Sequence, residues 1–495
     1  MGVKVIVIGA GVGGIATAAL LAKRGFEVEV FEKTGSLGGR CDSLEIKGHR
    51  FDSGATMFLM PEVFADFFAS MGERLEDHLK VAKIDPTCSL DFADGTRLDL
   101  SSNLELMRRQ LDSFEEGAFG SFLRHLSFGY EAYRDAIPRF IRKDFDRMGD
   151  FINPANLLAL LKLRAFQKHY ALVARSFKDE RLRAAFTYQD VYVGMSPFAA
   201  PALFSLFPFM EIVNGLWCPI GGMGALSAAL VGIARKAGVK FHLDSPVTRI
   251  ETEGGRAGAV IVNEDERHEA DAIVANADLP YVYRSLLPDD GTSARLASKK
   301  YSCSAMTFYL GLSRRLDGLE TQHSVYFSKD YGAGFGALSN PRSVPEEYHF
   351  YINAPTRHDP SAAPAGRDSL MVAVPVANLD PAFEPNYDGI REKARAYVMS
   401  RLSRATGSDV DSLVDLEVCY SPKTWRDRLN LERGSVFGSL AHDMFQIGWF
   451  RPANHHARFK NLYFCGGSTL PGSGVPMVLI GAMLTSARLG DDFAA

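Results

Sequence analysis

The pattern of apolar and polar positions is clearest at the start of the chain. Residues 4–8, KVIVI, form a nearly continuous apolar run that predicts a buried parallel strand. Small and apolar residues recur at helical spacing over 12–24, and Gly25 ends the expected helix. Residues 26–31 alternate between apolar and polar side chains, which predicts a second strand. This strand–helix–strand order indicates an α/β domain with a parallel sheet.

The C-terminal end repeats the strand–turn–helix order. Residues 462–464 predict a short strand, and a loop rich in glycine and proline follows over 466–476. Small and apolar residues from about 478 to 489 predict a helix. A helix that follows such a loop points its first backbone amides at an anionic or electron-rich group. We therefore expect the two ends of the chain to converge on one ligand.

The interior of the chain contains a helix, a strand pair and one long apolar stretch. Residues 226–237 predict an amphipathic helix, and alternating residues on both sides of Gly254 and Gly255 predict paired strands. The stretch 191–217 approaches the length of a membrane span, but three prolines and Glu211 interrupt it. We interpret this stretch as buried core or the wall of a tunnel.

The N-terminal turn has the spacing G-x-G-x-x-G at Gly9, Gly11 and Gly14. The first glycine permits the tight turn, the second lets the backbone approach a pyrophosphate, and the third lets helix and strand pack closely. Glu32 ends the second strand, where a ribose hydroxyl needs an acceptor. Because a carboxylate repels a ribose 2′-phosphate, this pattern disfavours NADP and leaves NAD and FAD open.

The residues after the second strand, 38–54, help to distinguish between NAD and FAD. Gly38 and Gly39 let the backbone close over a cofactor, and Gly54 lies in another chain reversal. Arg40 follows the glycine pair and can balance the charge of a phosphate. Taken alone, Arg40 also fits a surface ion pair.

Composition narrows the class of protein. The chain has 495 residues, enough for two or more domains and a long buried ligand. Hydrophobic residues make up 46% and charged residues 23%, and the net charge of −4 argues against binding to nucleic acid through bulk charge. Six cysteines form no C-x-x-C pair, which favours a reducing compartment and gives no support to disulfides or a zinc site.

Four stretches together carry a family resemblance. They are the N-terminal fingerprint with GSLGGR, residues 188–206, residues 215–230 and residues 466–482. On these stretches the chain resembles the carotenoid (phytoene) desaturase-like FAD-dependent oxidoreductases of the amine-oxidase-like flavoprotein superfamily, over nearly its whole length. The resemblance implies FAD as the cofactor. It also implies an α/β fold in which a Rossmann-type FAD-binding domain, assembled from separated segments, carries an inserted α+β substrate domain.

The resemblance further implies a division of the chain. The FAD-binding domain would comprise 1–85, 214–290 and 456–495. The substrate and membrane-associating domain would comprise 86–213 and 291–455.

The resemblance places cofactor contacts at both ends of the chain and at Val247, whose short strand would present its backbone to the adenine. The expected cofactor residues are Gly9, Gly11, Gly14, Glu32, Gly38, Gly39, Arg40, Gly54, Val247, Gly466, Gly467, Val475, Pro476 and Met477. The family usually has histidine where this chain has Leu470. This departure is either drift at a loose contact or a sign of a changed substrate or changed proton handling near the flavin.

The sequence shows no catalytic acid–base set and no metal-ligand spacing, so no catalytic residue is assigned and no metal is expected. His455 and His456 are expected in a solvent-facing loop. A cofactor can perform hydride chemistry without such a set. We expect FAD to take a hydride equivalent from an allylic carbon of a long polyene, such as phytoene or a related terpenoid precursor, while the neighbouring carbon loses a proton. Quinone or oxygen would then accept the electrons.

Other functions stay open on the sequence alone. The nearest is a desaturase or isomerase of the same family that acts on another polyene or a terpenoid. An amine oxidase and a non-catalytic prenyl carrier are more distant alternatives.

Because a very apolar substrate resides in a bilayer, we expect peripheral attachment to a membrane, and the cysteine pattern favours a cytoplasmic location. The stretch 139–170 interleaves Arg and Lys with Phe and Leu, as interfacial helices do. An ordinary solvated helical face fits this stretch equally well.

Overall fold

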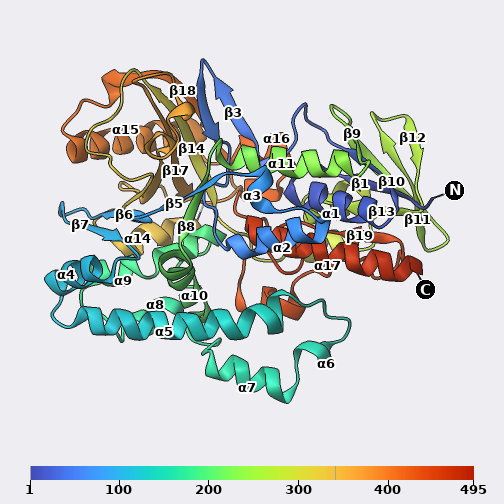
Figure 1. The fold of residues 1–495 in the computed structure, drawn as a ribbon, viewed down its shortest axis with the longest axis horizontal. Coiled ribbons are helices and arrows are strands. Elements are labelled where there is room, and N and C mark those ends of the chain that lie inside the picture. The colour runs from blue at the N-terminus through green and yellow to red at the C-terminus, as the bar shows by residue number, and fades with distance from the viewer. Residues whose placement is uncertain (1, 341, 495) are drawn as a thin grey trace.

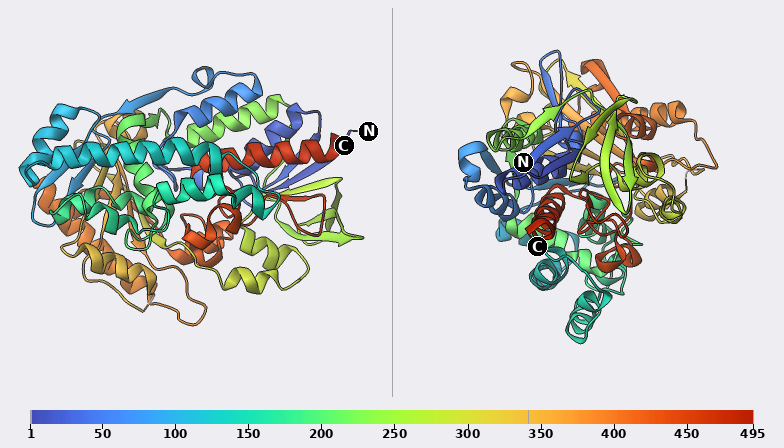
Figure 2. Two further views of the ribbon diagram at one scale, coloured as in Figure 1. Left: turned by 90° about the horizontal axis from the view of Figure 1, so that it is seen from below. Right: turned by 90° about the vertical axis from the view of Figure 1, so that its right-hand side faces the viewer.

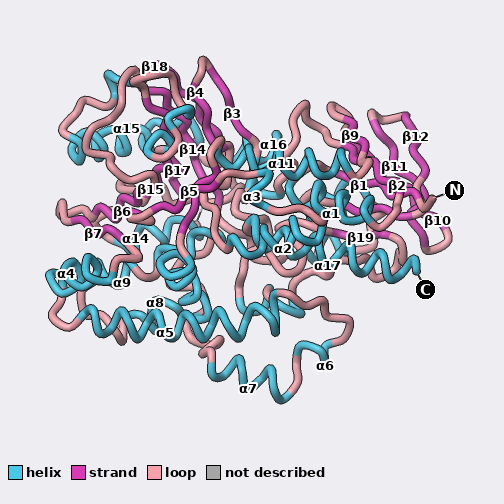
Figure 3. Tube along the Cα trace, viewed as in Figure 1, coloured by secondary structure: helices cyan, strands magenta, loops and turns pink. Residues whose placement is uncertain are grey.

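The computed structural model describes residues 2–340 and 342–494. Two groups of strands and a layer of helices make up the molecule, and the two ends of the chain lie at the same end of it (Figures 1 and 2). Figure 3 shows the strands gathered in two places, with helices around and below them.

The first group of strands is a five-stranded parallel sheet. Its order is β19 (Leu462–Phe464), β13 (Ala272–Ala275), β1 (Lys4–Ile8), β2 (Glu27–Phe31) and β9 (Lys240–His242). The sheet therefore joins strands from three stretches far apart in the sequence. The strand predicted at 4–8 is confirmed, and so are the alternating strand that follows it and the short C-terminal strand.

Three helices pack together beside this sheet: α1 (Val12–Lys23), α11 (Gly222–Lys236) and α17 (Val475–Ala494). Two of them differ from the predicted bounds. The helix predicted at 226–237 begins four residues earlier, at Gly222, and the helix predicted at 478–489 begins three residues earlier, at Val475. The second difference arises because Pro476 lies in the first turn of α17, where the missing N–H has no helical partner to lose.

A small antiparallel sheet follows the order β10 (Val247–Glu253), β11 (Arg256–Val262) and β12 (Glu266–Glu269). The strand pair predicted around Gly254 and Gly255 is confirmed, and both glycines adopt positive φ. The apolar side chains of β10 and β11 pack with those of β1 and β13 in one core.

The second group of strands is a seven-stranded, mostly antiparallel sheet. Its order is β18 (Val414–Tyr420), β14 (Ser304–Leu312), β17 (Asp368–Val376), β16 (Phe350–Asn353), β15 (His323–Tyr326), β6 (Cys88–Asp91) and β7 (Arg97–Leu100). Helix α15 (Tyr387–Thr406) packs its apolar side chains against this sheet. Every residue of β14 is buried, so this strand is covered on both faces.

Two strand pairs complete the sheet structure. Strand β3 (Ser43–Ile46) pairs with β4 (His49–Asp52), and β5 (Val81–Ile84) pairs with β8 (Leu216–Pro219). Strand β4 contacts both α11 and β17, so it lies where the two sheet regions meet.

A layer of helices lies below the sheets in Figure 1. It consists of α4 (Leu104–Phe114), α5 (Ala118–Ala136), α6 (Met148–Phe151), α7 (Pro154–Lys162), α8 (His169–Val173), α9 (Glu180–Ala185) and α10 (Leu206–Phe209). Helix α7 stands clear of the body in the end-on view of Figure 2. Further helices among the described residues are α2 (Pro61–Met71), α3 (Leu75–His78), α12 (Leu279–Tyr281), α13 (Thr292–Ala297), α14 (Tyr331–Gly336) and α16 (Pro422–Leu429).

The stretch 139–170 is not one continuous helix. Asn153 caps the start of α7 by accepting a hydrogen bond from the Asn156 amide, and Pro154 occupies the first turn, so α6 and α7 are separate. Over residues 2–340 and 342–494, no helix is both long and apolar enough to cross a membrane.

The expected solvent-facing loop at His455 and His456 is wrong for His456. Its side chain is buried, and its Nδ1 accepts hydrogen bonds from the backbone amides of Arg458 and Phe459. The imidazole stabilises the turn that leads into β19, which explains its burial.

Candidate active site

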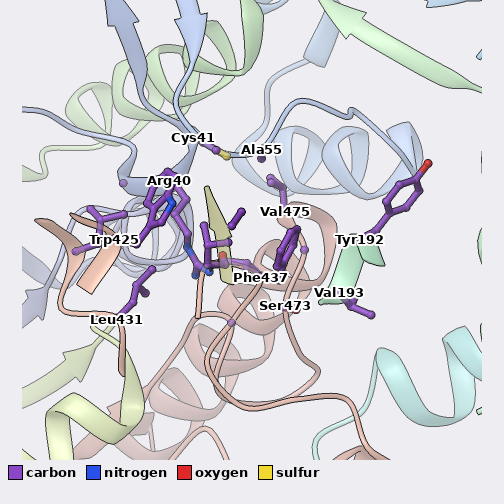
Figure 4. Close-up of a pocket in the computed structure, with 18 of the residues that line it drawn as sticks. Arg40, Cys41, Ala55, Tyr192, Val193, Trp425, Leu431, Phe437, Ser473 and Val475 are labelled. Atoms are coloured by element: carbon purple, nitrogen blue, oxygen red, sulfur yellow. Dashed lines mark hydrogen bonds between the residues drawn. The ribbon is translucent and has the colours of Figure 1, made fainter. Parts of the chain in front are cut away.

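A cavity of about 450 Å³ lies between the two sheet regions. One end is lined by the turns that follow β1 and β2 and by the loop before α17, and the other end is lined by residues of β14, β15, β16 and β17. Figure 4 shows part of this cavity, with Arg40 and Trp425 on one side and Tyr192 and Val193 on the other.

Apart from Gly14, all of the cofactor residues predicted from the sequence line this cavity. Gly14 lies behind the turn. A Cβ atom there would come within 2.1 Å of the Gly9 carbonyl oxygen, so only glycine lets α1 pack this closely on the end of β1.

The two ends of the chain meet at Gly13, which the sequence analysis did not single out. A Cβ atom at Gly13 would lie 2.6 Å from Asn276 Oδ1 and 2.8 Å from Val478 Cγ1. The N-terminal turn, the end of β13 and the start of α17 are therefore in contact. Asn276 also donates a hydrogen bond to the Gly9 carbonyl over 3.3 Å. A residue of this kind, alone after a strand, has no recognisable spacing in the sequence.

The Glu32 carboxylate is held in place by the chain itself. Its Oε2 accepts a hydrogen bond from the Ala10 amide at 2.7 Å, and its Oε1 accepts from the amide and hydroxyl of Thr34 at 2.9 Å. Glu32 lines the cavity. Because a carboxylate has about four acceptor positions, it retains capacity for a ligand hydroxyl.

Arg40 lines the cavity beside Gly38 and Gly39, both of which have positive φ. Its Nη1 donates to the Val436 carbonyl at 3.0 Å, and no ion pair to Arg40 occurs among the described residues. Burial lowers the pKa of this guanidinium, which the charge of Asp278 partly offsets. The positive charge is thus oriented toward the cavity rather than held in a surface ion pair.

The loop before α17 is organised by Arg451, which the sequence analysis missed. This side chain is 2% exposed. It donates hydrogen bonds to the backbone carbonyls of Leu440, Gln446, Gly467 and Thr469. Burial lowers the pKa of Arg451 to about 10, with Asp278 opposing the shift. One buried cation therefore ties the glycine pair to the chain segment before it.

The far end of the cavity is walled mainly by apolar and aromatic side chains. The lining there includes Tyr188, Val191, Tyr192, Val193, Phe207, Met210, Val325, Phe327, Phe335, Phe350, Tyr351, Met371 and Ala373. Several of these belong to the stretch 191–217, so the predicted tunnel wall is confirmed. No group of three or more His, Cys, Asp or Glu side chains that could hold a metal occurs within residues 2–340 and 342–494.

The Tyr351 hydroxyl is one of the polar groups in this largely apolar wall. The Tyr351 hydroxyl lies 2.7 Å from Thr56 Oγ1 and 2.6 Å from His323 Nδ1. Burial lowers the pKa of His323 to about 3, so the imidazole that shares a hydrogen bond with the Tyr351 hydroxyl is neutral. This arrangement orients the Tyr351 ring without adding a charge to the cavity.

Comparisons with known proteins agree with this geometry. Residues 12–489 match the family model described as flavin-containing amine oxidoreductase. The chain belongs to this family. It is 43% identical to a zeta-carotene-forming phytoene desaturase of Myxococcus xanthus, with 99% of this chain and 94% of the relative aligned. It is 38% identical to a phytoene desaturase of Phycomyces blakesleeanus, with 99% and 85% aligned.

A solved structure of an oxidoreductase from Methanosarcina mazei has a TM-score of 0.66 to this chain at 18% identity, over 97% of this chain and 99% of that one. This likeness shows the fold alone. Together the comparisons confirm the predicted family, the α/β FAD-binding fold and FAD as the cofactor of an oxidoreductase.

The residues that line the glycine-rich end of the cavity fit FAD. Side chains at Gly11 and Gly13 would fill the space over the N-terminal turn, since a Cβ at Gly11 would lie 3.0 Å from Asn276 Nδ2. Arg40 offers a positive charge that forms no ion pair in the described chain, and Glu32 offers an acceptor. These residues would hold the diphosphate and the ribose, while the loop before α17 would face the flavin ring.

Leu470 does not line the cavity. Its side chain is buried in a cluster with Phe140, Phe145 and Phe151, between the C-terminal loop and the helical layer. The departure from the family pattern therefore places an apolar anchor under the loop, and the side chain has no access to a proton at the cofactor.

Proposed function

We propose that the protein is an FAD-dependent desaturase that introduces double bonds into a long apolar polyene of the phytoene class. The observation that carries this proposal is one cavity with two unlike ends. A glycine-lined nucleotide end runs directly into a wall of aliphatic and aromatic side chains. The names of the relatives, which are phytoene desaturases, support the same substrate class.

The reaction removes two hydrogens from adjacent carbons of the substrate. When bound, FAD supplies the two-electron acceptor for the hydride that leaves an allylic carbon. The neighbouring carbon loses a proton, and the electron pair of that C–H bond becomes the new π bond. Quinone or oxygen then accepts the two electrons, which completes the balance.

The protein's own residues contribute position and exclusion of water. The apolar wall holds the chain of the polyene against the cofactor, and this alignment lowers the entropy cost of the hydride step. The neutral His323 and the hydroxyl of Tyr351 leave the wall uncharged there, so water gains little by entering. No strong base is needed, because conjugation stabilises the charge that develops on the polyene.

We further propose that the protein meets its substrate at a membrane surface through α6, α7 and the residues around them. The exposed side chains are Met148, Ile152, Leu157, Leu158, Leu161 and Phe166, and Leu158 is 69% exposed. Leu157, Leu158 and Leu161 share one face of α7 by their spacing. Exposed Arg147, Lys162 and Arg164 flank these residues. Such a combination supports interfacial binding to anionic lipid.

Expression in a host that makes phytoene tests the activity. We expect coloured extracts, because each added conjugated bond shifts the absorbance to longer wavelength. The product should be two mass units lighter per step, whereas an isomerase would leave the mass unchanged. Colourless extracts from cells that contain folded, flavin-loaded protein would remove phytoene as the substrate.

Liposome flotation tests the membrane surface. We expect the wild-type protein to float with vesicles that contain anionic lipid, and the Leu158→Glu and Leu161→Glu double variant to stay in the dense fraction. Leu243→Glu is the matched control and should float, because Leu243 is also partly exposed but follows β9, outside the proposed membrane surface. Equal flotation of all three proteins would overturn the proposed surface.

A further inference from the structure

An acidic group, Glu211, lies directly behind the apolar wall of the cavity. Glu211 belongs to a π-helical turn, Met210–Asn214, and its side chain is 0% exposed. Its neighbour Met210 lines the cavity. This is the residue that interrupts the apolar stretch 191–217, and nothing in the mechanism above uses it.

Only neutral groups donate hydrogen bonds to Glu211 in the described part of the chain. Oε1 accepts from Thr87 Oγ1 at 3.1 Å and from the Tyr188 hydroxyl at 3.3 Å. Oε2 accepts from Gln189 Nε2 at 3.3 Å and from the Tyr192 hydroxyl at 3.2 Å. Over residues 2–340 and 342–494, no lysine, arginine or histidine forms an ion pair with it.

A fully buried carboxylate with no counter-ion is unfavourable for stability. Burial raises the pKa of Glu211 above its ordinary value, and four hydrogen bonds oppose this shift only in part by favouring the charged form. A well-packed apolar residue would serve a purely structural role at lower cost. The placement of such a group beside a cavity therefore indicates a function.

The two tyrosines connect this carboxylate to the substrate space. Tyr188 and Tyr192 both line the cavity, and their rings meet edge to face with centroids 5.9 Å apart. The face of an aromatic ring attracts positive charge, and a phenol that donates its proton toward a carboxylate gains electron density in its ring. The two rings thus carry part of the negative character of Glu211 to the cavity wall.

We propose that Glu211, through Tyr188 and Tyr192, makes this wall electronegative and stabilises the positive charge that the polyene develops as hydride leaves. This inference rests on the proposed function, and Glu211 acts in it as a positioning residue that does not touch the substrate. No atom is transferred to Glu211. The negative charge of its ionised form is matched to the transition state rather than to the neutral polyene, so ionised Glu211 should accelerate the reaction without strengthening substrate binding.

A pair of ligands tests the wall without turnover. The first probe is a C20 isoprenoid chain with a tertiary ammonium nitrogen in mid-chain, and the second is the all-carbon chain of equal length. Both are titrated into the holoenzyme in detergent, and the flavin difference spectrum reports binding. We expect the wild type to prefer the ammonium chain about tenfold and Glu211→Gln to lose that preference, since cation–π and charge contributions are of this size. Equal preference in both proteins would overturn the proposal.

Single-turnover reduction of the flavin under anaerobic conditions is the second test. We expect Glu211→Gln to slow reduction about tenfold or more while the concentration of phytoene at half-saturation stays within about twofold. Tyr192→Phe keeps the ring and removes one hydroxyl, so it should show a smaller slowing. A variant that only binds phytoene more weakly, with an unchanged limiting rate, would show that Glu211 merely shapes the wall and would contradict the inference.

Two further outcomes separate this inference from the proposed function. If Glu211→Gln does not fold with FAD, the Tyr188→Phe and Tyr192→Phe double variant takes its place in the same ligand test. If the wild type desaturates no polyene but still prefers the ammonium chain, the proposed substrate is wrong and the electronegative wall stands.

Discussion

The two ends of the cavity are built by different means. At the nucleotide end the backbone forms the wall, and glycines at defined positions let α1, β13 and α17 approach one another. At the far end, where we propose that the polyene binds (the polyene end), side chains from the seven-stranded sheet and from the stretch 191–217 form the wall, and no glycine spacing is involved. The first end depends on a few positions that tolerate one residue type. The second depends on the summed shape of many side chains.

This difference extends to charge. At the nucleotide end Arg40 and Glu32 line the cavity, where we propose that they meet a charged, polar ligand, and each is fixed by hydrogen bonds to the chain. At the far end of the cavity, where we propose that the polyene binds, Glu211 lies behind two aromatic rings. A ligand that is permanently charged needs direct contacts with charged side chains. For a ligand that becomes charged only during the reaction, we propose that the electrostatic field of a charged group behind the wall stabilises the transition state.

Gly14→Ala is expected to have the largest effect, because it adds a side chain at the nucleotide end, where the close approach of the backbone leaves no room for a methyl group. The added methyl group would overlap the Gly9 carbonyl oxygen, so α1 and β1 must separate. We expect a loss of about 4 kcal/mol, at the large end for one substitution, and purified protein without bound flavin. The ratio of flavin absorbance to protein absorbance measures this.

Gly232→Ala is the matched control for that change. Gly232 also lies within a helix, α11, but a Cβ atom there meets nothing within 4 Å. Alanine is favoured over glycine in a helix by about 1 kcal/mol, so this variant should bind FAD normally and melt at a higher temperature. A Gly14→Ala protein with full flavin content would contradict the importance of the close approach.

Arg451→Met is expected to have the next largest effect. It removes the donor for four buried backbone carbonyls around the C-terminal glycine pair. We expect the free energy of unfolding to fall by about 3 kcal/mol and FAD to bind more weakly, since each unsatisfied buried acceptor is costly. Thermal melts with and without added FAD measure both quantities. Arg458→Met, at an exposed arginine in the same segment, should change the melting temperature little.

The same contrast between the two ends of the cavity explains which parts of the site could be predicted from the sequence. Gly9, Gly11 and Glu32 could be read from spacing, because a parallel strand, a tight turn and a helix must follow in that order for a nucleotide to bind. Arg451 and Asn276 could not, since each acts from a segment that only the fold brings to the glycine loops. The walls of the polyene end were predicted only as apolar, because many combinations of large side chains fill a wall equally well.

Glu32→Gln is expected to have a moderate effect, and it should change FAD binding at the nucleotide end without changing the polyene end. Glutamine keeps the shape but weakens the acceptor that we assign to the ribose, and it cannot accept equally at both ends of its amide. We expect FAD to bind about tenfold more weakly, which corresponds to about 1.4 kcal/mol, with no change in the spectrum of the coloured product. Titration of the apoprotein with FAD measures the affinity.

Glu27→Gln is the control on the same strand. Glu27 lies at the start of β2, and its side chain is 54% exposed in a salt bridge with Lys240. Such a surface pair contributes little, so FAD affinity should be unchanged. Equal weakening by both substitutions would show that strand β2, rather than the Glu32 carboxylate, is what FAD binding senses.

Phe207→Leu should have the smallest effect, and it tests the claim that the polyene end works by summed shape. Phe207 lines the cavity and packs near Tyr192, with ring centroids 6.4 Å apart. A change from Phe to Leu keeps an apolar surface of similar size, so neighbouring side chains can close most of the gap. We expect flavin content to stay constant and KM for the polyene to rise about twofold, or about 0.4 kcal/mol. Phe493→Leu, which alters a ring that packs on Phe26 outside the cavity, should leave KM unchanged. A loss of activity at Phe207 comparable to that at Gly14 would mean that the apolar wall, like the glycine turn, depends on single positions.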